Sequence, residues 1–156
     1  RVGRAGRLAR GGAERVAIVH DINEDIPRTH SFGVVLALEY LHKGGRIGGA
    51  SAFLGSLINI KPILQLQDGR IEPLEKVRSR AKAMDRLVEI LVDRAGRSRK
   101  LHGAVVNALA PAEAEALRGR LAAALPFAEM YTLPLSPAIG THTGPGTVGT
   151  GFWAED

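Results

Sequence analysis

An Asp-Gly dipeptide at residues 68–69 separates two stretches, residues 60–67 and 70–77, in which apolar and polar side chains tend to alternate. Alternation with a period of two is typical of β-strands, and Asp-Gly is a preferred pair for the tight turn of a β-hairpin. The pattern therefore predicts an antiparallel hairpin, and it is the clearest element of the chain.

The rest of the sequence alternates between helical and strand patterns. Residues 32–38 form a continuous apolar run of strand length, which is typical of a strand buried on both faces. Residues 79–94 carry apolar side chains at helical spacing, which predicts an amphipathic helix. Further helices or helical turns are expected at residues 1–10, 13–25, 39–43, 50–57 and from 110 to about 125, further strands at residues 101–109, 127–133 and 148–153, and a turn-rich loop or short helix at residues 137–146.

These elements predict an α/β (α+β) sandwich, in which helices pack on one mixed sheet of about six strands. A chain of 156 residues is long enough for one such domain with a sizeable core. No apolar run approaches the ~20 residues that span a bilayer, so no stable membrane insertion is expected. The chain contains no cysteine, which leaves no disulfides or thiolate metal sites and fits a cytoplasmic protein.

The formal net charge of +5 raises the question of nucleic-acid binding. Residues 1–15 hold five arginines and one glutamate, whereas the rest of the chain holds 16 basic and 15 acidic side chains. The excess charge is therefore expected on a solvated helix at the N-terminal end. Only 4% of the residues are aromatic, which leaves little surface for stacking with bases, and no nucleic-acid partner is expected.

Residues 39–62 combine a basic, glycine-rich bend with apolar side chains. Glycines in the Lys43-Gly44-Gly45-Arg46 bend let the backbone turn tightly, and free amides beside two cations suit an anionic group. The apolar residues that follow the bend could line a slot next to that charge. This combination indicates a ligand that has both an acidic end and an apolar body.

The order of residues in three segments resembles the DegV family of bacterial fatty-acid-binding proteins. The segments are residues 39–62, residues 68–78 and the Gly140-Thr141-His142-Thr143-Gly144-Pro145-Gly146 stretch before the last strand. The resemblance implies the C-terminal lobe of a two-domain protein that holds a fatty acid between its lobes. Residues 1–28 would then be a helical segment from the end of the N-terminal lobe, and residues 29–156 the C-terminal fatty-acid-binding domain. The N-terminal lobe, which in the family supplies a Ser/Thr loop to the carboxylate, is not in this sequence.

Arg46 and His142 are the first candidates for binding the head group. A guanidinium forms paired hydrogen bonds with a carboxylate or acyl phosphate, and an imidazole can hydrogen-bond the same group. On the residues alone, Arg46 could instead form a salt bridge, for example with Glu39, and His142 could cap backbone carbonyls. The resemblance to the family favours the site for both.

Three further polar residues are candidates for the same site. Thr143, like Thr141, could donate its hydroxyl to an oxyanion or could satisfy carbonyls of its own loop. Arg78 and Arg80 resemble the basic residue that the family places near the phosphate or at the rim facing a kinase. Each could equally be a surface charge at the start of a helix.

The sequence offers candidates for lining an acyl chain and none for binding a metal. Residues with apolar side chains near the glycine-rich bend could line the acyl chain or could be ordinary core residues. No histidine has metal-ligand spacing to other ligands, so no metal is expected, and Asn59 and Lys61 are expected to form a structural turn. The acyl-chain candidates are Phe53, Leu54, Leu57, Ile58 and Ile63.

Two functions follow from these observations. The first, which the resemblance implies, is a lipid-binding protein that holds a long-chain fatty acid and presents its carboxylate to a separate, ATP-binding fatty acid kinase. The alternative is an enzyme that acts on a small phosphorylated or carboxylic substrate. The sequence shows no nucleophile–base pair, and Gly144-Pro145-Gly146 lacks the Lys-Ser/Thr that completes a phosphate-binding loop, so no catalytic residue is assigned. An open apolar and basic cleft beside residues 44–60 is also expected to favour self-association.

Overall fold

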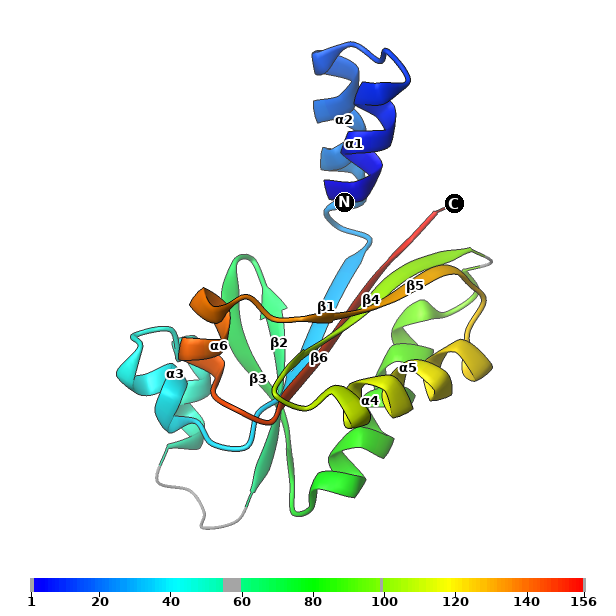
Figure 1. Cartoon of the computed structure of the whole chain (residues 1–156). Coiled ribbons are helices and arrows are strands. Elements are labelled where there is room, and N and C mark those ends of the chain that lie inside the picture. The colour runs from blue at the N-terminus through cyan, green and yellow to red at the C-terminus, as the bar shows by residue number, and fades with distance from the viewer. Residues whose placement is uncertain (1, 55–59, 99, 156) are drawn as a thin grey trace.

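The computed structural model describes residues 2–54, 60–98 and 100–155, and these form one mixed six-stranded sheet with helices packed on it (Figure 1). The strand order is β3-β2-β1-β6-β4-β5, and only β4 and β5 pair in parallel. The predicted fold class is confirmed. The strands are β1 (Thr29–Val34), β2 (Lys61–Gln67), β3 (Arg70–Val77), β4 (Leu101–Ala108), β5 (Phe127–Pro134) and β6 (Thr147–Ala154).

The helices fall into three groups. The first two helices form a helical hairpin beyond one end of the sheet, near the C-terminus of the chain (Figure 1). The two long helices pack on β1, β2, β4 and β5, whereas the short helices gather at the opposite end of the strands. The helices are α1 (Val2–Arg10), α2 (Arg15–Asp25), α3 (Glu39–Lys43), the 3-10 helix η1 (Gly48–Phe53), α4 (Arg80–Ala95), α5 (Pro111–Ala124) and α6 (Pro137–Thr143). No helix in the described ranges combines the length and apolarity that a bilayer crossing requires.

The β2–β3 hairpin forms as predicted. Asp68 and Gly69 have φ of 50° and 76°, and positive φ at both central residues is what a type I′ turn requires. Pro73 has no backbone N–H, but it is tolerated in β3 because this edge strand pairs on one side only, with β2. The hairpin therefore places residues 60–77 at one edge of the sheet.

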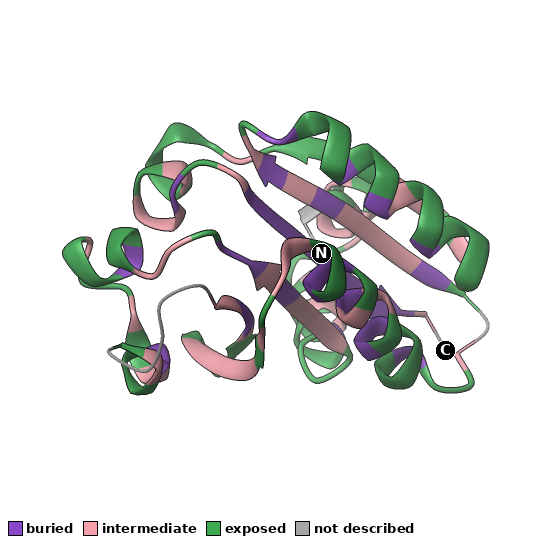
Figure 2. Ribbon diagram, turned by 90° about the horizontal axis from the view of Figure 1, so that it is seen from below, coloured by how far each residue is buried: buried purple, intermediate pink, exposed green. Residues whose placement is uncertain are grey.

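The main core lies between the sheet and the helices α4 and α5, where buried residues gather in Figure 2. Ser79 caps α4 by accepting a hydrogen bond from the Lys82 amide, and Gly96 ends the helix with φ of 55°. The predicted amphipathic helix is confirmed, because one side of α4 is buried in this core. Its buried residues are Ala83, Met84, Leu87, Ile90, Leu91 and Ala95.

A second, smaller core lies on the opposite face of the sheet. Ile63 belongs to the main core and its neighbour Leu64 to the small one, and successive side chains of a strand point to opposite faces. The small core joins the sheet to α3 and η1 through Leu41 and Ala50. It holds the short helices against β2 and β3, and thereby positions the glycine-rich bend.

Two predicted elements have different bounds. The strand expected at residues 32–38 is wrong at both ends, since β1 covers Thr29–Val34. Pairing with β6 extends from Thr29↔Trp153 to Val34↔Val148, so the partner strand rather than the apolar run sets the limits. Val35 then enters the small core and Leu36 is 41% exposed. The helix expected at residues 50–57 is instead a 3-10 helix over Gly48–Phe53, and residues 55–57 lie outside the described ranges.

Candidate functional site

The glycine-rich bend after α3 lies against the C-terminal end of α6. A Cβ atom on Gly44 would clash with Nδ1 of His142, so a residue without a side chain is needed at this position. The contact is reciprocal, because a Cβ atom on Gly144, whose φ is 80°, would clash with the ring of Tyr40. Each of the two segments thus carries a glycine that accommodates a ring of the other.

Two neighbouring side chains at the end of α6 hold buried polar atoms without a partner. Nδ1 of His142 and Oγ1 of Thr143 are buried, and neither forms a hydrogen bond with any residue of the described ranges. Thr141 differs, because its hydroxyl donates to the Pro137 carbonyl at 2.7 Å within the helix. Buried polar atoms in folded proteins are nearly always paired, so two adjacent exceptions mark this helix end as a place for a ligand or water.

Arg46 lies on the same bend as Gly44. Its Nη1 donates a hydrogen bond to the Gly44 carbonyl at 3.0 Å, and the side chain is exposed. The alternative salt bridge with Glu39 does not form, because Glu39 pairs with Lys43 at 3.6 Å. The guanidinium of Arg46 and the imidazole of His142 therefore both contact Gly44, although they come from distant parts of the sequence.

The two other candidate arginines differ in their surroundings. Arg78 is exposed and forms no ion pair within the described part of the chain. Arg80 is largely covered, and its guanidinium donates to a carboxylate oxygen of Glu113 and to the carbonyls of Val34 and Gly146. Arg80 is thus committed to contacts within the protein.

The apolar candidates separate into three kinds. Phe53 is half-buried beneath the ammonium of Lys76, which lies 4.6 Å from the ring centroid, and Leu54 is 40% exposed. Ile63 is fully buried in the main core, where it acts as an ordinary core residue. Leu57 and Ile58 lie outside the described residues, as does Asn59. Lining of an acyl chain by Phe53 and Leu54 stays a prediction.

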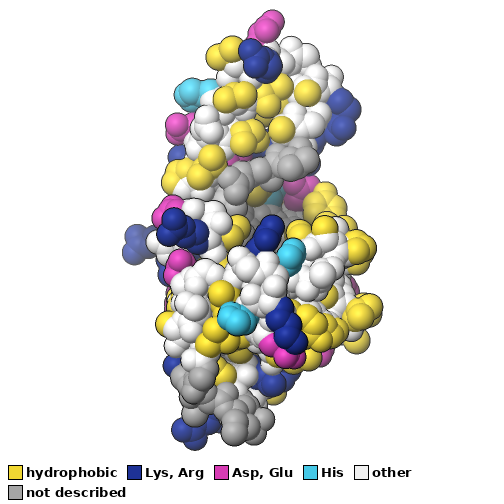
Figure 3. Space-filling model, turned by 90° about the vertical axis from the view of Figure 1, so that its left-hand side faces the viewer, with side chains coloured by type: hydrophobic (Ala, Val, Ile, Leu, Met, Phe, Trp, Pro, Cys, Tyr) yellow, Lys and Arg dark blue, Asp and Glu magenta, His cyan; other side chains and the backbone are white. Residues whose placement is uncertain are grey.

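Exposed apolar side chains surround the end of the sheet that carries α3 and α6. Figure 3 shows hydrophobic side chains gathered in clusters on this side of the molecule. Leu36, Tyr40, Leu133 and Ile139 are among the large apolar residues that are exposed here. Self-association through this face stays a prediction.

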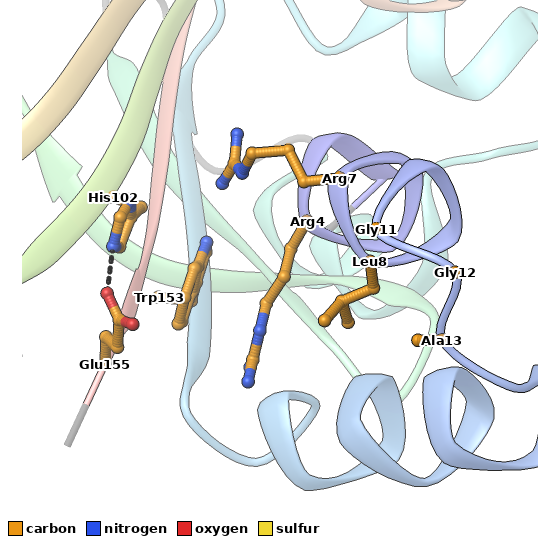
Figure 4. A pocket seen from close by; sticks show the side chains of 9 residues that line it. All are labelled: Arg4, Arg7, Leu8, Gly11, Gly12, Ala13, His102, Trp153 and Glu155. Carbon is orange, nitrogen blue, oxygen red and sulfur yellow. Dashed lines mark hydrogen bonds and ion pairs between the residues drawn. The ribbon is translucent and has the colours of Figure 1, made fainter.

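A cavity that the sequence did not indicate lies between α1 and the sheet and has a volume of about 510 Å³. Trp153 lies between His102 and Arg4 (Figure 4). The rings of His102 and Trp153 stack with centroids 4.3 Å apart, and the Arg4 guanidinium lies 5.2 Å from the Trp153 ring centroid. These contacts attach the helical hairpin to the sheet.

His102, Arg7 and Glu155 of this cavity form hydrogen bonds and ion pairs with one another or with residues beside it. The His102 ring nitrogens lie 2.8 Å from Oε1 of Glu129 and 2.7 Å from Oε2 of Glu155, and Arg7 and Lys100 complete ion pairs with these two carboxylates. Hydrogen bonds from Lys100 and His102 lower the pKa of Glu155 to about 2, and hydrogen bonds from Tyr131 and His102 lower the pKa of Glu129. Because the charges are already satisfied, we interpret the cluster as a structural joint. No group of three potential ligands in the described ranges has an arrangement suited to a metal ion.

Comparison with known proteins identifies the family. The model of the DegV family, described as a family of uncharacterised proteins, matches residues 1–155. This chain belongs to the DegV family. A DegV domain-containing protein of Streptomyces coelicolor is 48% identical over 122 residues, covering 78% of this chain and 43% of the relative. The DegV protein of Bacillus subtilis is 35% identical over 147 residues, covering 94% of this chain and 52% of the relative.

Solved DegV structures share the fold. A Thermus thermophilus DegV family protein, described as binding fatty acid, superposes with a TM-score of 0.92 at 33% identity, over 99% of this chain and 55% of that chain. The Bacillus subtilis structure, described as a fatty acid binding protein, gives a TM-score of 0.82 at 33% identity, over 97% and 54%. This chain therefore spans about half the length of the DegV proteins that it matches.

Proposed function

We propose that this chain is the C-terminal fatty-acid-binding domain of a DegV protein and binds the carboxylate of a long-chain fatty acid between α3 and α6. In this proposal residues 29–156 are the domain, and residues 1–28 are a helical segment from the end of a preceding lobe. The observation that carries the proposal is the pair of unpartnered buried atoms, Nδ1 of His142 and Oγ1 of Thr143, beside the bend that holds Arg46.

These groups match the chemistry of a carboxylate. A carboxylate that leaves water needs charge-assisted hydrogen bonds, each of which contributes about 1.5–3 kcal/mol. Arg46 uses one of its N–H donors on the Gly44 carbonyl, and a guanidinium has five. His142 and Thr143 supply a ring nitrogen and a hydroxyl from the opposite side of the bend. A second lobe would supply the remaining donors.

The acyl chain supplies most of the affinity in this proposal. Burial of each CH₂ group contributes about 0.8 kcal/mol but does not select one direction along the slot. The head-group residues therefore decide the orientation of the ligand. The descriptions of the Thermus thermophilus and Bacillus subtilis structures as fatty acid binding support the same ligand class for this chain.

We also propose that the protein is not itself an enzyme and that it presents the bound carboxylate to an ATP-binding fatty acid kinase. Phosphoryl transfer requires a site that binds the nucleotide phosphates, and the glycine-rich loop at residues 144–146 lacks the Lys-Ser/Thr of such a site. Arg78, exposed just before α4, is the basic residue we place at the rim facing the kinase. No observation favours the alternative of an enzyme for small phosphorylated or carboxylic substrates.

Mass spectrometry of the full-length protein tests the proposal directly. The protein is purified under native conditions, denatured, and its organic extract is analysed for long-chain fatty acids. A stoichiometric fatty acid that is reduced in the Arg46→Ala variant and fully retained in a His20→Ala variant supports the proposal, since His20 is an exposed histidine of α2. No co-purified acid, together with no binding of added palmitate or oleate, would rule it out.

A further inference from the structure

The side chain of Arg80 joins four separate parts of the domain. It lies at the first residue of α4 and is only 19% exposed. Its Nε donates to Oε2 of Glu113 in α5 at 2.7 Å, its Nη2 to the Gly146 carbonyl at 2.6 Å, and its Nη1 to the Val34 carbonyl at 3.4 Å. One guanidinium therefore connects α4, α5, the end of β1 and the loop between α6 and β6.

Both backbone partners of Arg80 lead into the head-group site. Gly146 follows closely after His142 and Thr143 in the sequence, and its amide is fixed in turn by the Ala108 carbonyl at 2.7 Å. Val34 is the last residue of β1, from which the chain continues into α3 and the Gly44 bend. Arg80 thus contacts the segment that leads to the Gly44 bend and the segment that follows His142, although it lies in neither segment.

We infer that Arg80 is a positioning residue, which holds the loop after His142 at a fixed distance from the strand that leads to Gly44. Its role in the proposed function, on which this inference rests, is to keep the head-group donors in place and not to bind the ligand. A guanidinium suits this role because its planar fork reaches several acceptors at once, whereas a lysine ammonium is a single point of charge.

A matched control exists on the same two helices. Arg120 of α5 pairs with Asp85 of α4 at 2.8 Å, so it also bridges α4 and α5. Within the residues that the structure describes, Arg120 forms no hydrogen bond or ion pair with the α6–β6 loop or the end of β1, whereas Arg80 bonds to both. A comparison of the two arginines therefore separates positioning of the site from general stabilisation of the helix pair.

The test uses nuclear magnetic resonance of the ligand-free full-length protein together with palmitate binding. In Arg80→Ala we expect the His142 imidazole and the Gly44 and Gly146 amide signals to move, and palmitate affinity to fall roughly ten-fold. Arg120→Ala should leave both unchanged, and Arg80→Lys should lie between Arg80→Ala and the unmodified protein. If Arg80→Ala does not fold, Glu113→Ala removes one anchor of the same guanidinium and should move the same signals.

The outcomes distinguish this inference from the proposed function. Unchanged His142 and Gly44 signals in Arg80→Ala overturn the inference, and so does a loss of affinity without any signal change, because the latter means that Arg80 binds the ligand itself. Absence of palmitate binding by the unmodified protein refutes the proposed function alone. The signals of the ligand-free protein would still show whether Arg80 positions the loop.

Discussion

The imidazole of His142 occupies the space that a side chain on Gly44 would need. A helix end and a bend from distant parts of the sequence thereby come into contact at one point. The contact is close because Gly44 has no Cβ atom, so the ring lies directly against the backbone of the bend. Arg46 reaches the same glycine through its carbonyl, so the position of Gly44 controls both candidate head-group residues.

The first prediction concerns the Gly44→Ala variant. The added methyl group should displace the His142 ring, and the loss of one charge-assisted hydrogen bond should weaken fatty acid binding about ten-fold. Binding of a fluorescent fatty acid to the full-length protein measures the change. Gly140→Ala is the control, because Gly140 lies in the same helix as His142 and a Cβ atom there meets nothing within 4 Å. Equal affinities for Gly44→Ala and the unmodified protein would contradict the proposed site.

The second prediction separates the roles of His142 and Arg46. In the full-length protein, His142→Ala should reduce phosphorylation of the bound fatty acid by a kinase partner more than it reduces acyl binding. Arg46→Ala should reduce both by about ten-fold or more, since its guanidinium carries the charge that offsets the carboxylate. Parallel assays of palmitate binding and of acyl phosphate formation provide the comparison. Unaltered acyl phosphate formation in both variants would refute the mechanism.

The third prediction concerns stability at acidic pH. Since folding lowers the pKa of Glu155 from 4.5 to about 2, the unfolded chain binds a proton here at a higher pH than the folded chain does. The stabilisation is therefore fully present above pH 4.5 and is lost as the pH falls toward about 2. Glu155→Gln should have a lower thermal unfolding midpoint at pH 7, and this midpoint should change less between pH 4.5 and 2.5.

Thermal unfolding of the unmodified protein and of two variants at pH 7, 4.5 and 2.5 checks this. Glu24→Gln is the control, because Glu24 is exposed and forms no ion pair within the part of the chain that the structure describes. If Glu155→Gln has the same pH dependence as Glu24→Gln, then the ion pairs of Glu155 with Lys100 and His102 do not contribute to stability.

The fourth prediction tests the hairpin turn. Gly69→Ala should destabilise the protein by about 1–2 kcal/mol, because an L-residue is strained at φ of 76°. Crowding does not contribute, since a Cβ atom on Gly69 meets nothing within 4 Å. Gly119→Ala, in an equally open position of α5, should instead be neutral or stabilise by about 0.5–1 kcal/mol. Urea unfolding of both variants gives the two free energies, and a neutral Gly69→Ala would contradict the assigned turn.

The sequence predicted the local elements well. The turn at Asp68 and Gly69 depends on two adjacent residues, and the Ser79 cap and the apolar stripe of α4 depend on residues within a few turns of one helix. Such features are encoded in short stretches. The α3 segment and the α6 segment could also be chosen as candidates from their residue order, because the family resemblance covers both.

Features that depend on distant partners could not be predicted. The limits of β1 follow from its pairing with β6, which is nearly the whole domain away in the sequence. The cluster around His102 brings together Arg7, Glu129 and Glu155 from four separate segments, and none of them forms a recognisable motif with the others. The contacts of Arg80 could not be predicted either, since two of its three acceptors are backbone carbonyls, which every residue carries.

The reciprocal packing of rings against glycines at the ends of α3 and α6 restricts how a ligand could enter between them. The ring of His142 packs against Gly44, and the ring of Tyr40 packs against Gly144, so the two segments interlock. Sliding one helix along the other would drive both rings into backbone atoms. If the proposed site binds a fatty acid, the head group can enter between α3 and α6 only when these segments move apart, and Gly45, with φ of 67°, is the point of the bend where the backbone can rotate most freely.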